Sequence, residues 1–191
     1  MLNCISGFKS AVLIGTKSSE GIDNLAVFNS VVHIGANPPL MGFILRPTTV
    51  RRDTYENIKD TKYYTFNHIN SEIIINSHQT AASYDASESE FEAVGLSKEY
   101  IEDCNAPFVK ESKIKIGLEY VNEYPIEENG TILIIGKVIY LSFPDEIQSE
   151  DGWLDIAKAD TVAINGLDSY YTPTKASRLS YAVPERMPKE I

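Results

Sequence analysis

The stretch from Arg46 to Thr54 carries the residue types best suited to bind a phosphate group. It reads Arg-Pro-Thr-Thr-Val-Arg-Arg-Asp-Thr, so three guanidinium groups and three hydroxyls fall within nine residues. The whole chain has a formal net charge of −10, and this stretch inverts the charge locally. Guanidinium groups grip phosphate oxygens in pairs, and hydroxyls and the first amides of a following helix add donors. The pattern indicates a small anionic ligand, with Arg46, Thr48, Arg51 and Thr54 as its candidate contacts.

A second interpretation of the same stretch is purely structural. Asp53 and Glu56 lie within or just after it. Exposed arginines commonly pair with surface carboxylates in solvent, where such pairs contribute little. The residues alone leave both interpretations open.

Asn29 and Ser30 are polar residues inside an apolar stretch that alternates with the period of a β-strand. Phe28 precedes them and Val31 follows. A buried polar side chain needs a hydrogen-bond partner, which either the edge of a ligand or a neighbouring strand can supply. The sequence therefore marks Asn29, Ser30 and Val31 as candidate ligand contacts and leaves a structural role open.

Other kinds of active site find no support in the sequence. His33, His68 and His78 lie far apart, with no cysteine or carboxylate at the spacing of a metal site. Cys4 and Cys104 have no base nearby in sequence. Neither a glycine-rich dinucleotide motif nor a phosphate-loop motif is present. We therefore assign no metal ligand and no catalytic residue, and we expect a bound cofactor to supply the chemistry.

Length and composition favour one ordinary globular domain. The chain has 191 residues, of which 43% are hydrophobic, and no apolar run is long enough to span a bilayer. The first residues do not resemble a signal peptide, and two distant cysteines are most simply read as reduced thiols, so we expect a cytoplasmic protein. An acidic chain without a segregated basic face is an improbable partner for nucleic acid.

Strand-like alternation and turn signals predict an antiparallel β-protein. Asn37-Pro38-Pro39 ends one strand, and Asn129-Gly130 indicates a hairpin. The predicted strands cover residues 8–16, 24–36, 40–45, 63–69, 113–120 and 131–143. Six or so strands with short connections fit a closed antiparallel barrel better than a parallel sheet, which needs long helical crossovers.

Helices are expected mainly in the middle of the chain. A short helix is predicted over 53–59, and a second is predicted from Ser71 toward residue 82. Ser87 and Glu90 have the spacing of a capping box, with Gly95 as the stop, and 97–103 is expected to add a helical turn or two. We expect a helical insertion around 71–106 within a single domain, 1–191.

Three segments together resemble the flavin reductase-like family, whose members have an FMN-binding split β-barrel. They are NSVVHIGANPP (29–39), LRPTTVRRDTYENI (45–58) and GLDSYY (166–171). The resemblance extends over nearly the whole chain. It implies a mainly β fold, an antiparallel split barrel, bound FMN and a homodimer with the flavin near the interface.

The resemblance also assigns roles to the candidate residues. The FMN phosphate is expected at Arg46, Thr48, Arg51 and Thr54, and the flavin ring at Asn29, Ser30 and Val31. His78 lies where similar proteins have a polar segment close to the flavin. Tyr171 is the first candidate to cover the ring, although a tyrosine pair such as Tyr170-Tyr171 is also common in core packing.

Three functions remain open on this basis. The first is an FMN-dependent oxidoreductase that takes hydride from NADH or NADPH, bound transiently, and reduces free flavin or another acceptor. The second is a flavoredoxin-like electron carrier without turnover. The third is a barrel that serves only as an interaction module. A hydride-transfer site on flavin needs no acid or base from the protein, so the sequence does not separate the first two.

Overall fold

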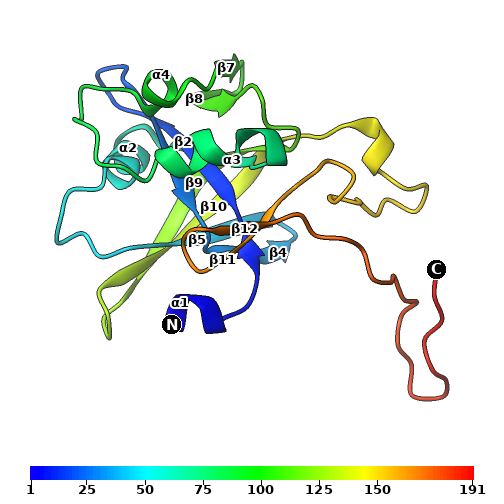
Figure 1. Ribbon diagram of the computed structural model, residues 1–191. Helices are drawn as coiled ribbons and strands as arrows, with labels where there is room; N and C mark the ends of the chain where they lie inside the picture. Colours follow the sequence, from blue (N-terminus) through cyan, green and yellow to red (C-terminus); the bar gives the residue numbers. More distant parts are fainter.

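The computed structural model describes residues 1–191 and is built around one antiparallel sheet of seven strands (Figure 1). The strand order is β3-β2-β6-β9-β10-β5-β4. The strands are β2 Val12–Lys17, β3 Asp23–Phe28, β4 Val31–Ala36, β5 Pro39–Leu45, β6 Tyr63–His68, β9 Lys115–Ile126 and β10 Thr131–Ser142.

The sheet curls into a barrel whose two outer strands, β3 and β4, are consecutive in the chain but do not pair with each other. Only Asn29 and Ser30 separate β3 from β4. The amide of Ile44 in β5 donates to the Ser30 carbonyl at 3.2 Å, which extends the β4–β5 pairing into this bend. Outer strands joined by two residues must lie close together, so the sheet curls into a barrel. The predicted mainly β, antiparallel split barrel is confirmed.

Two apolar clusters lie on opposite faces of the strands, as the two-residue period requires. Val12 and Ile14 point into a cluster with Phe43, Tyr64 and Phe66, whose rings meet edge to face. On the other face, Leu13, Leu25, Phe91 and Val94 belong to a second cluster that packs the middle helices against the barrel.

The remaining elements are short. A small sheet has the order β1-β11-β12, and β7 pairs with β8. These strands are β1 Lys9–Ser10, β7 Lys98–Ile101, β8 Cys104–Val109, β11 Ala163–Asn165 and β12 Ser169–Tyr171. The helices are α1 Leu2–Ile5, α2 Asp53–Thr61, η1 Ser71–Ile73, α3 Ile74–Gln79, α4 Glu90–Val94 and η2 Asp145–Ile147. None of the helices combines the length and apolar character needed to cross a membrane.

Two predicted strands are in fact pairs of strands. The stretch 8–16 divides at Ala11, because β1 pairs with β11 in the small sheet while β2 pairs with β3 and β6 in the barrel. The stretch 24–36 divides at Asn29 and Ser30, where the chain passes from one outer strand to the other. Alternation alone cannot reveal a change of sheet, since the two-residue period continues through it.

The predicted helix starts need correction. Asn70, rather than Ser71, caps the first turn by accepting from the Glu72 amide at 3.1 Å. The capping box at Ser87 is wrong, because α4 begins at Glu90 and the Ser87 hydroxyl bonds to Asp85 at 2.6 Å instead. The stop at Gly95 is confirmed by its φ of +72°.

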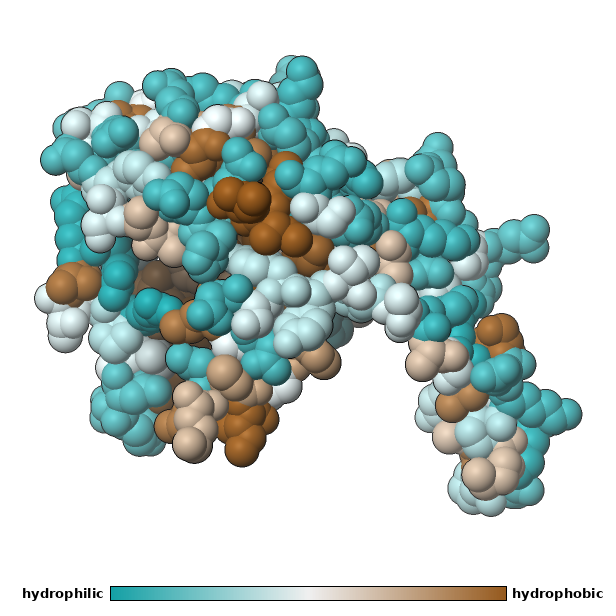
Figure 2. Space-filling view, viewed as in Figure 1, coloured by the Kyte–Doolittle hydropathy of each residue, from teal (hydrophilic) through white to brown (hydrophobic).

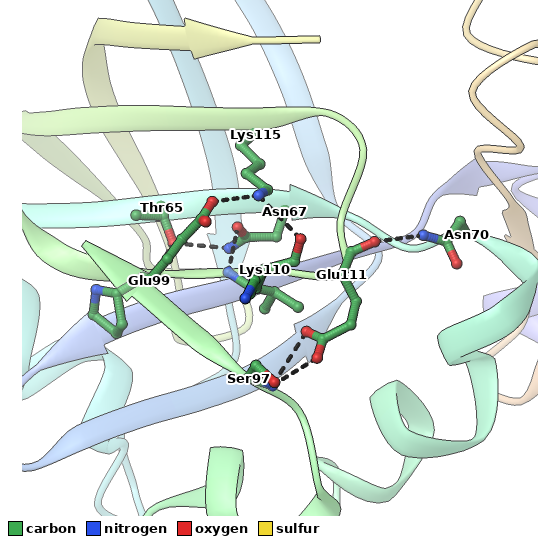
Figure 3. A network of polar contacts seen from close by, with 10 residues as sticks. Thr65, Asn67, Asn70, Ser97, Glu99, Lys110, Glu111 and Lys115 are labelled. Atoms are coloured by element: carbon green, nitrogen blue, oxygen red, sulfur yellow. Dashed lines mark hydrogen bonds and ion pairs between the residues drawn. The ribbon is translucent and has the colours of Figure 1, made fainter. Parts of the chain in front are cut away.

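The stretch 97–103 is part of the β7–β8 hairpin, so the prediction of helical turns there is wrong. Figure 3 shows why this hairpin is held against the barrel. The Val109 amide donates to Asn67 Oδ1 at 2.9 Å, and the Ser97 amide donates to the Glu111 carboxylate at 2.9 Å. Lys115 also pairs with Glu99 of β7. Contacts with β6 and β9 thus override the local helical signal.

The last residues, 172–191, form a segment that we call the C-terminal arm. Figure 1 shows it, orange to red, leaving the body beyond β12, and Figure 2 shows it as a separate lobe. It turns back on itself through two bridges, Leu179 with Glu190 and Val183 with Arg186.

Candidate functional site

The Asn29–Ser30 bend is fixed to two other parts of the chain. Asn29 Nδ2 donates to the carbonyl of Gly166 at 2.8 Å. Ser30 Oγ donates to the carbonyl of Ile44 at 2.9 Å, and Val31 is the register partner of Phe43. The structure therefore brings the predicted ring contacts next to the end of β5 and to the start of the 166–171 segment.

Gly166 is a participant that the sequence analysis did not single out. Its φ of +67° is one that glycine adopts without strain. A Cβ at this position would lie 3.0 Å from Cys4 Sγ of α1, so α1 packs directly against it. In the sequence, Gly-Leu-Asp indicated only a turn. It did not show that Asn29 is the hydrogen-bond partner of Gly166.

His78 and Tyr171 are not brought together. His78 Nδ1 lies 3.2 Å from the hydroxyl of Tyr170, and their rings meet edge to face at 5.8 Å. Tyr171 instead packs edge to face on Phe8 with the ring centres 4.8 Å apart. Consecutive residues of a strand point to opposite faces, so His78 and Tyr171 belong to different sides of β12.

The arginine-rich corner follows β5 directly. Arg51 Nε contacts Asp53 Oδ1 at 2.7 Å, and Asp53 raises the pKa of the Arg51 guanidinium. Arg52 Nε donates to the Pro47 carbonyl at 3.4 Å. Arg46, Thr48 and Thr49 are exposed, and their side chains have no hydrogen bond or ion pair within the chain. Part of the corner is thus paired as the structural interpretation expects, and part remains free.

Thr54 has an interior position. Only 5% of the residue is exposed, and its hydroxyl accepts from Asn24 Nδ2 at 3.2 Å. The first amides of α2 have no side-chain cap, although Asp53 and Glu56 lie in its first turn. Thr54 therefore ties α2 to β3, while the uncapped amides remain a possible anion contact.

A cavity of about 480 Å³ lies beside the corner but does not suit a phosphate. Of the predicted residues only Arg51 lines it. Its eight carboxylates are Glu20, Asp23, Asp53, Glu56, Asp60, Asp85, Glu88 and Glu90. Their charge would repel an anion, so this cavity does not suit a phosphate, and the unpaired side chains of Arg46, Thr48 and Thr49 do not line it.

A second cavity, of about 260 Å³, is mainly apolar and is lined by Phe8, His68 and Ile156, among others. Burial lowers the pKa of His68 to about 4, so its imidazole is neutral at neutral pH. His68 Nδ1 lies 3.4 Å from Thr161 Oγ1. Neither cavity is lined by Asn29, Ser30, Val31, Arg46, Thr48, His78 or Tyr171.

The residues present fit part of what FMN requires. Free guanidinium and hydroxyl groups at Arg46, Thr48 and Thr49 suit the phosphate. The side-chain carbonyl of Asn29 makes no hydrogen bond within the chain and is available to a donor on the ring. Neither of the two cavities described above encloses these groups. No group of three or more metal-ligating side chains is present.

Comparison with known proteins gives one matching family model and several similar structures. The family model described as "Flavin reductase like domain" matches residues 5–160. A crystal structure from Shewanella frigidimarina NCIMB 400, assigned as a flavin reductase with a split barrel domain, is 50% identical with a TM-score of 0.91. That match covers 95% of this chain and 90% of the other, and so includes part of the C-terminal arm.

Two further proteins are less similar. An uncharacterized protein from Methanothermobacter thermautotrophicus (strain Delta H) is 32% identical over 152 residues, which cover 77% of this chain and 69% of that protein. The flavoredoxin of Desulfovibrio vulgaris (Miyazaki F) is 21% identical with a TM-score of 0.77, over 93% of this chain and 92% of that one. The likeness to the flavoredoxin concerns the fold alone.

Proposed function

The chain belongs to the flavin reductase-like family, and on this premise we propose that it is an FMN-binding oxidoreductase that takes hydride from NADH or NADPH. Electrons would pass to free flavin or to another acceptor. Bound FMN would supply the redox chemistry, because it accepts a hydride and releases electrons singly or in pairs. The protein residues bind the cofactor, orient it and control access to it.

The observation that carries the proposal is the position of the Asn29–Ser30 bend relative to the corner. Ser30 bonds to Ile44, and Arg46 follows Ile44 by two residues. Two extended residues span about 7 Å, which a ribityl chain can bridge. This short span of β5 supports a single FMN molecule that reaches from the bend to the corner.

Each residue has a defined task in this proposal. Arg46 and Thr48 hold the phosphate, and Arg51, which pairs with Asp53, would bind it only by exchanging Asp53 for the phosphate. Thr54 supports the corner from the interior through Asn24. Ser30 and Val31 present the strand edge to the ring, and Asn29 fixes the bend to Gly166.

His78 and Tyr171 would lie at the rim of the site. Tyr171 is half exposed, at 48%, and can cover one face of a bound ring. His78 is held on the Tyr170 side of β12 and would act on the site through Tyr170. The strand edge leaves the other face of the ring open, as stacking of a nicotinamide requires.

We extend the proposal to assembly and location. A homodimer is supported by the exposure of Arg46, Thr48 and Tyr171, since a second copy would cover them. A cytoplasmic location is supported by the two free thiols, Cys4 and Cys104. The single-domain arrangement, with residues 71–106 as an insertion, is part of the same proposal.

A second function, electron transfer without turnover, is supported by one feature of the site. The candidate side chains that form hydrogen bonds do so with the Gly166 and Ile44 carbonyls, with Asn24, Asp53 and Tyr170, and no two of them form an acid–base pair beside the bend. A carrier that only exchanges electrons with a protein partner needs no such pair. The two functions share the same FMN site and differ in whether a nicotinamide reaches the ring.

Flavin binding itself is tested on the purified protein. We expect yellow protein, or uptake of added FMN by the colourless form, and chromatography of the denatured sample should identify FMN. Colourless protein that takes up no FMN would remove both flavin functions and leave the barrel as an interaction module.

A further inference from the structure

The mainly apolar cavity of about 260 Å³ has no task in the proposed function. The buried residues Ala11 and Val162, each 1% exposed, form its floor. Phe8 and Ile156 also line it, and they are 64% and 46% exposed. The cavity is therefore open to solvent, and a ligand that entered it would cover apolar surface that the chain alone leaves in water.

The lining of this cavity excludes negative charge. The chain has 27 acidic side chains, and eight of them line the other cavity, but none lines this one. The amine of Lys9, which is the only lysine or arginine of the lining, donates to the Asn3 carbonyl at 2.7 Å. A charged ligand would lose its hydration here without a free partner of opposite charge. The cavity therefore suits an uncharged molecule.

Two polar side chains meet in the cavity. His68 Nδ1 lies 3.4 Å from Thr161 Oγ1, and Nε2 makes no hydrogen bond within the chain. Burial lowers the pKa of His68 to about 4, so at pH 7 its ring is neutral and has one nitrogen that donates and one that accepts. The unused nitrogen can bind one hydroxyl group of a ligand.

The volume of the cavity limits the ligand to one or two aromatic rings. An apolar cavity of about 150 Å³ is enough to bind benzene. At about 260 Å³, this cavity has room for a second fused ring or for substituents. A peptide segment would bring main-chain amides and carbonyls, for which the mainly apolar lining offers few partners.

The base of the C-terminal arm forms one wall of the cavity. Pro173 lines it, and Lys175 lies 5.1 Å from the ring centre of Trp153. Arg178 lies over the same ring at 4.6 Å. Trp153 precedes Ile156 by three residues, so these contacts hold the arm beside the segment that forms the opposite part of the lining. The wall at Pro173 is thus fixed by contacts outside the cavity.

We propose that this cavity is a binding site for a small uncharged aromatic alcohol of one or two rings, separate from the flavin site. The rings pack on Phe8, Ile156 and Val162, and the hydroxyl bonds to His68. Phe8 also contacts Tyr171, with the ring centres 4.8 Å apart, so the site adjoins the residue proposed to cover the flavin. Binding requires neither FMN nor a nicotinamide, and the inference therefore goes beyond the proposed function.

The first test uses 2-naphthol as the probe, because it is uncharged at pH 7 and fluorescent. Titration of the flavin-free protein should show saturable binding of one molecule per chain. The matched probe 2-naphthoate has the same two rings and a negative charge, so it should bind more weakly. Absence of saturable binding, or equal binding of 2-naphthoate, overturns the proposal.

The second test assigns the hydroxyl contact to His68. His68→Phe keeps a ring at this position and removes both nitrogens. A neutral hydrogen bond contributes about a fivefold difference in affinity, so the variant should weaken 2-naphthol by about that factor. Binding of naphthalene, which has no hydroxyl, should not weaken. Equal losses for the two probes, or no loss for 2-naphthol, contradict the assigned contact.

The third test places the probe in this cavity. Ala157→Leu and Ala163→Leu each add bulk to the lining, and each should lower 2-naphthol affinity by about tenfold. Ala82→Leu is the control, because Ala82 is exposed and lines neither cavity. Unchanged affinity in both lining variants, or an equal loss in the control, overturns the location.

Competition with FMN separates this site from the flavin site. In equilibrium dialysis, FMN-loaded and flavin-free protein should bind 2-naphthol with the same affinity. Displacement of the probe by FMN would show that the cavity holds the flavin, and it would overturn the proposal. Protein that binds 2-naphthol but no FMN would retain the new site and lose the proposed function.

Discussion

Asn29 and Gly166 are 137 residues apart in the chain, and the side-chain amide of one donates to the carbonyl of the other at 2.8 Å. This hydrogen bond joins the bend that closes the barrel to the segment that leads into β12. This contact therefore ties together the two elements of the candidate flavin site that lie outside the corner.

Asn29→Ala should weaken both the fold and the flavin site. Loss of one partly buried hydrogen bond should lower the free energy of unfolding by about 1 kcal/mol, measured by urea denaturation of the flavin-free protein. The freed bend should also lower FMN affinity in a fluorescence titration. Asn122→Ala, at an exposed position of β9, is the control. Unchanged stability and affinity would show that the contact does not hold the bend.

Arg46→Ala should weaken FMN more than riboflavin, because only FMN carries the phosphate. A charge-assisted hydrogen bond is worth about 1.5 to 3 kcal/mol, so FMN affinity should fall by roughly tenfold to a hundredfold. Lys113→Ala, which removes an exposed charge elsewhere, should affect neither ligand. Equal losses for the two flavins would mean that the corner has a structural role only.

Thr54→Val should act on stability rather than on phosphate discrimination. The substitution leaves the buried Asn24 amide without its acceptor, which should cost about 1 to 3 kcal/mol in unfolding free energy. The ratio of FMN to riboflavin affinity should stay near that of the wild type. A selective loss of FMN binding with unchanged stability would instead place Thr54 among the phosphate ligands.

His68 should make the fold less stable in mild acid. Its pKa is about 4 in the folded chain and 6.5 ordinarily, so above pH 6.5 it is neutral in both states and has no effect. As the pH falls from 6.5 toward 4, the unfolded chain takes up a proton that the folded chain does not, and stability falls. Urea midpoints at pH 7 and pH 5 should therefore differ less for His68→Gln than for wild type. His33→Gln, exposed on β4, should retain the wild-type difference.

Much of the fold could be predicted from the sequence because most strands show a clear apolar pattern between turn residues. The predicted strand 113–120 overlaps β9, Lys115–Ile126, and was identified by its two-residue period. The predicted strand 131–143 matches β10, Thr131–Ser142, and was identified as a long apolar run after the Asn129-Gly130 turn. Gly130, with a φ of +71°, sits in the connection where a hairpin was expected. The divisions at Ala11 and at Asn29 could not be predicted, because they depend on which strand pairs with which.

The sequence identified several residues of the candidate site but not how they are arranged. The sequence picked out Arg46 and Thr48, and these are exposed and free in the structure. It could not show that Thr54 turns toward Asn24, or that His78 meets Tyr170 rather than Tyr171. These contacts depend on packing between segments that are distant in sequence. Local sequence patterns do not predict such packing.

Anaerobic mixing of the FMN-loaded protein with NADH or NADPH tests the proposed oxidoreductase most directly. The flavin absorbance should bleach quickly and return when air is admitted. Because the chain has no dinucleotide-binding motif, the bleaching rate should saturate only at high nicotinamide concentration. If dithionite bleaches the flavin while neither nicotinamide does, the oxidoreductase proposal is contradicted and the electron-carrier function takes its place.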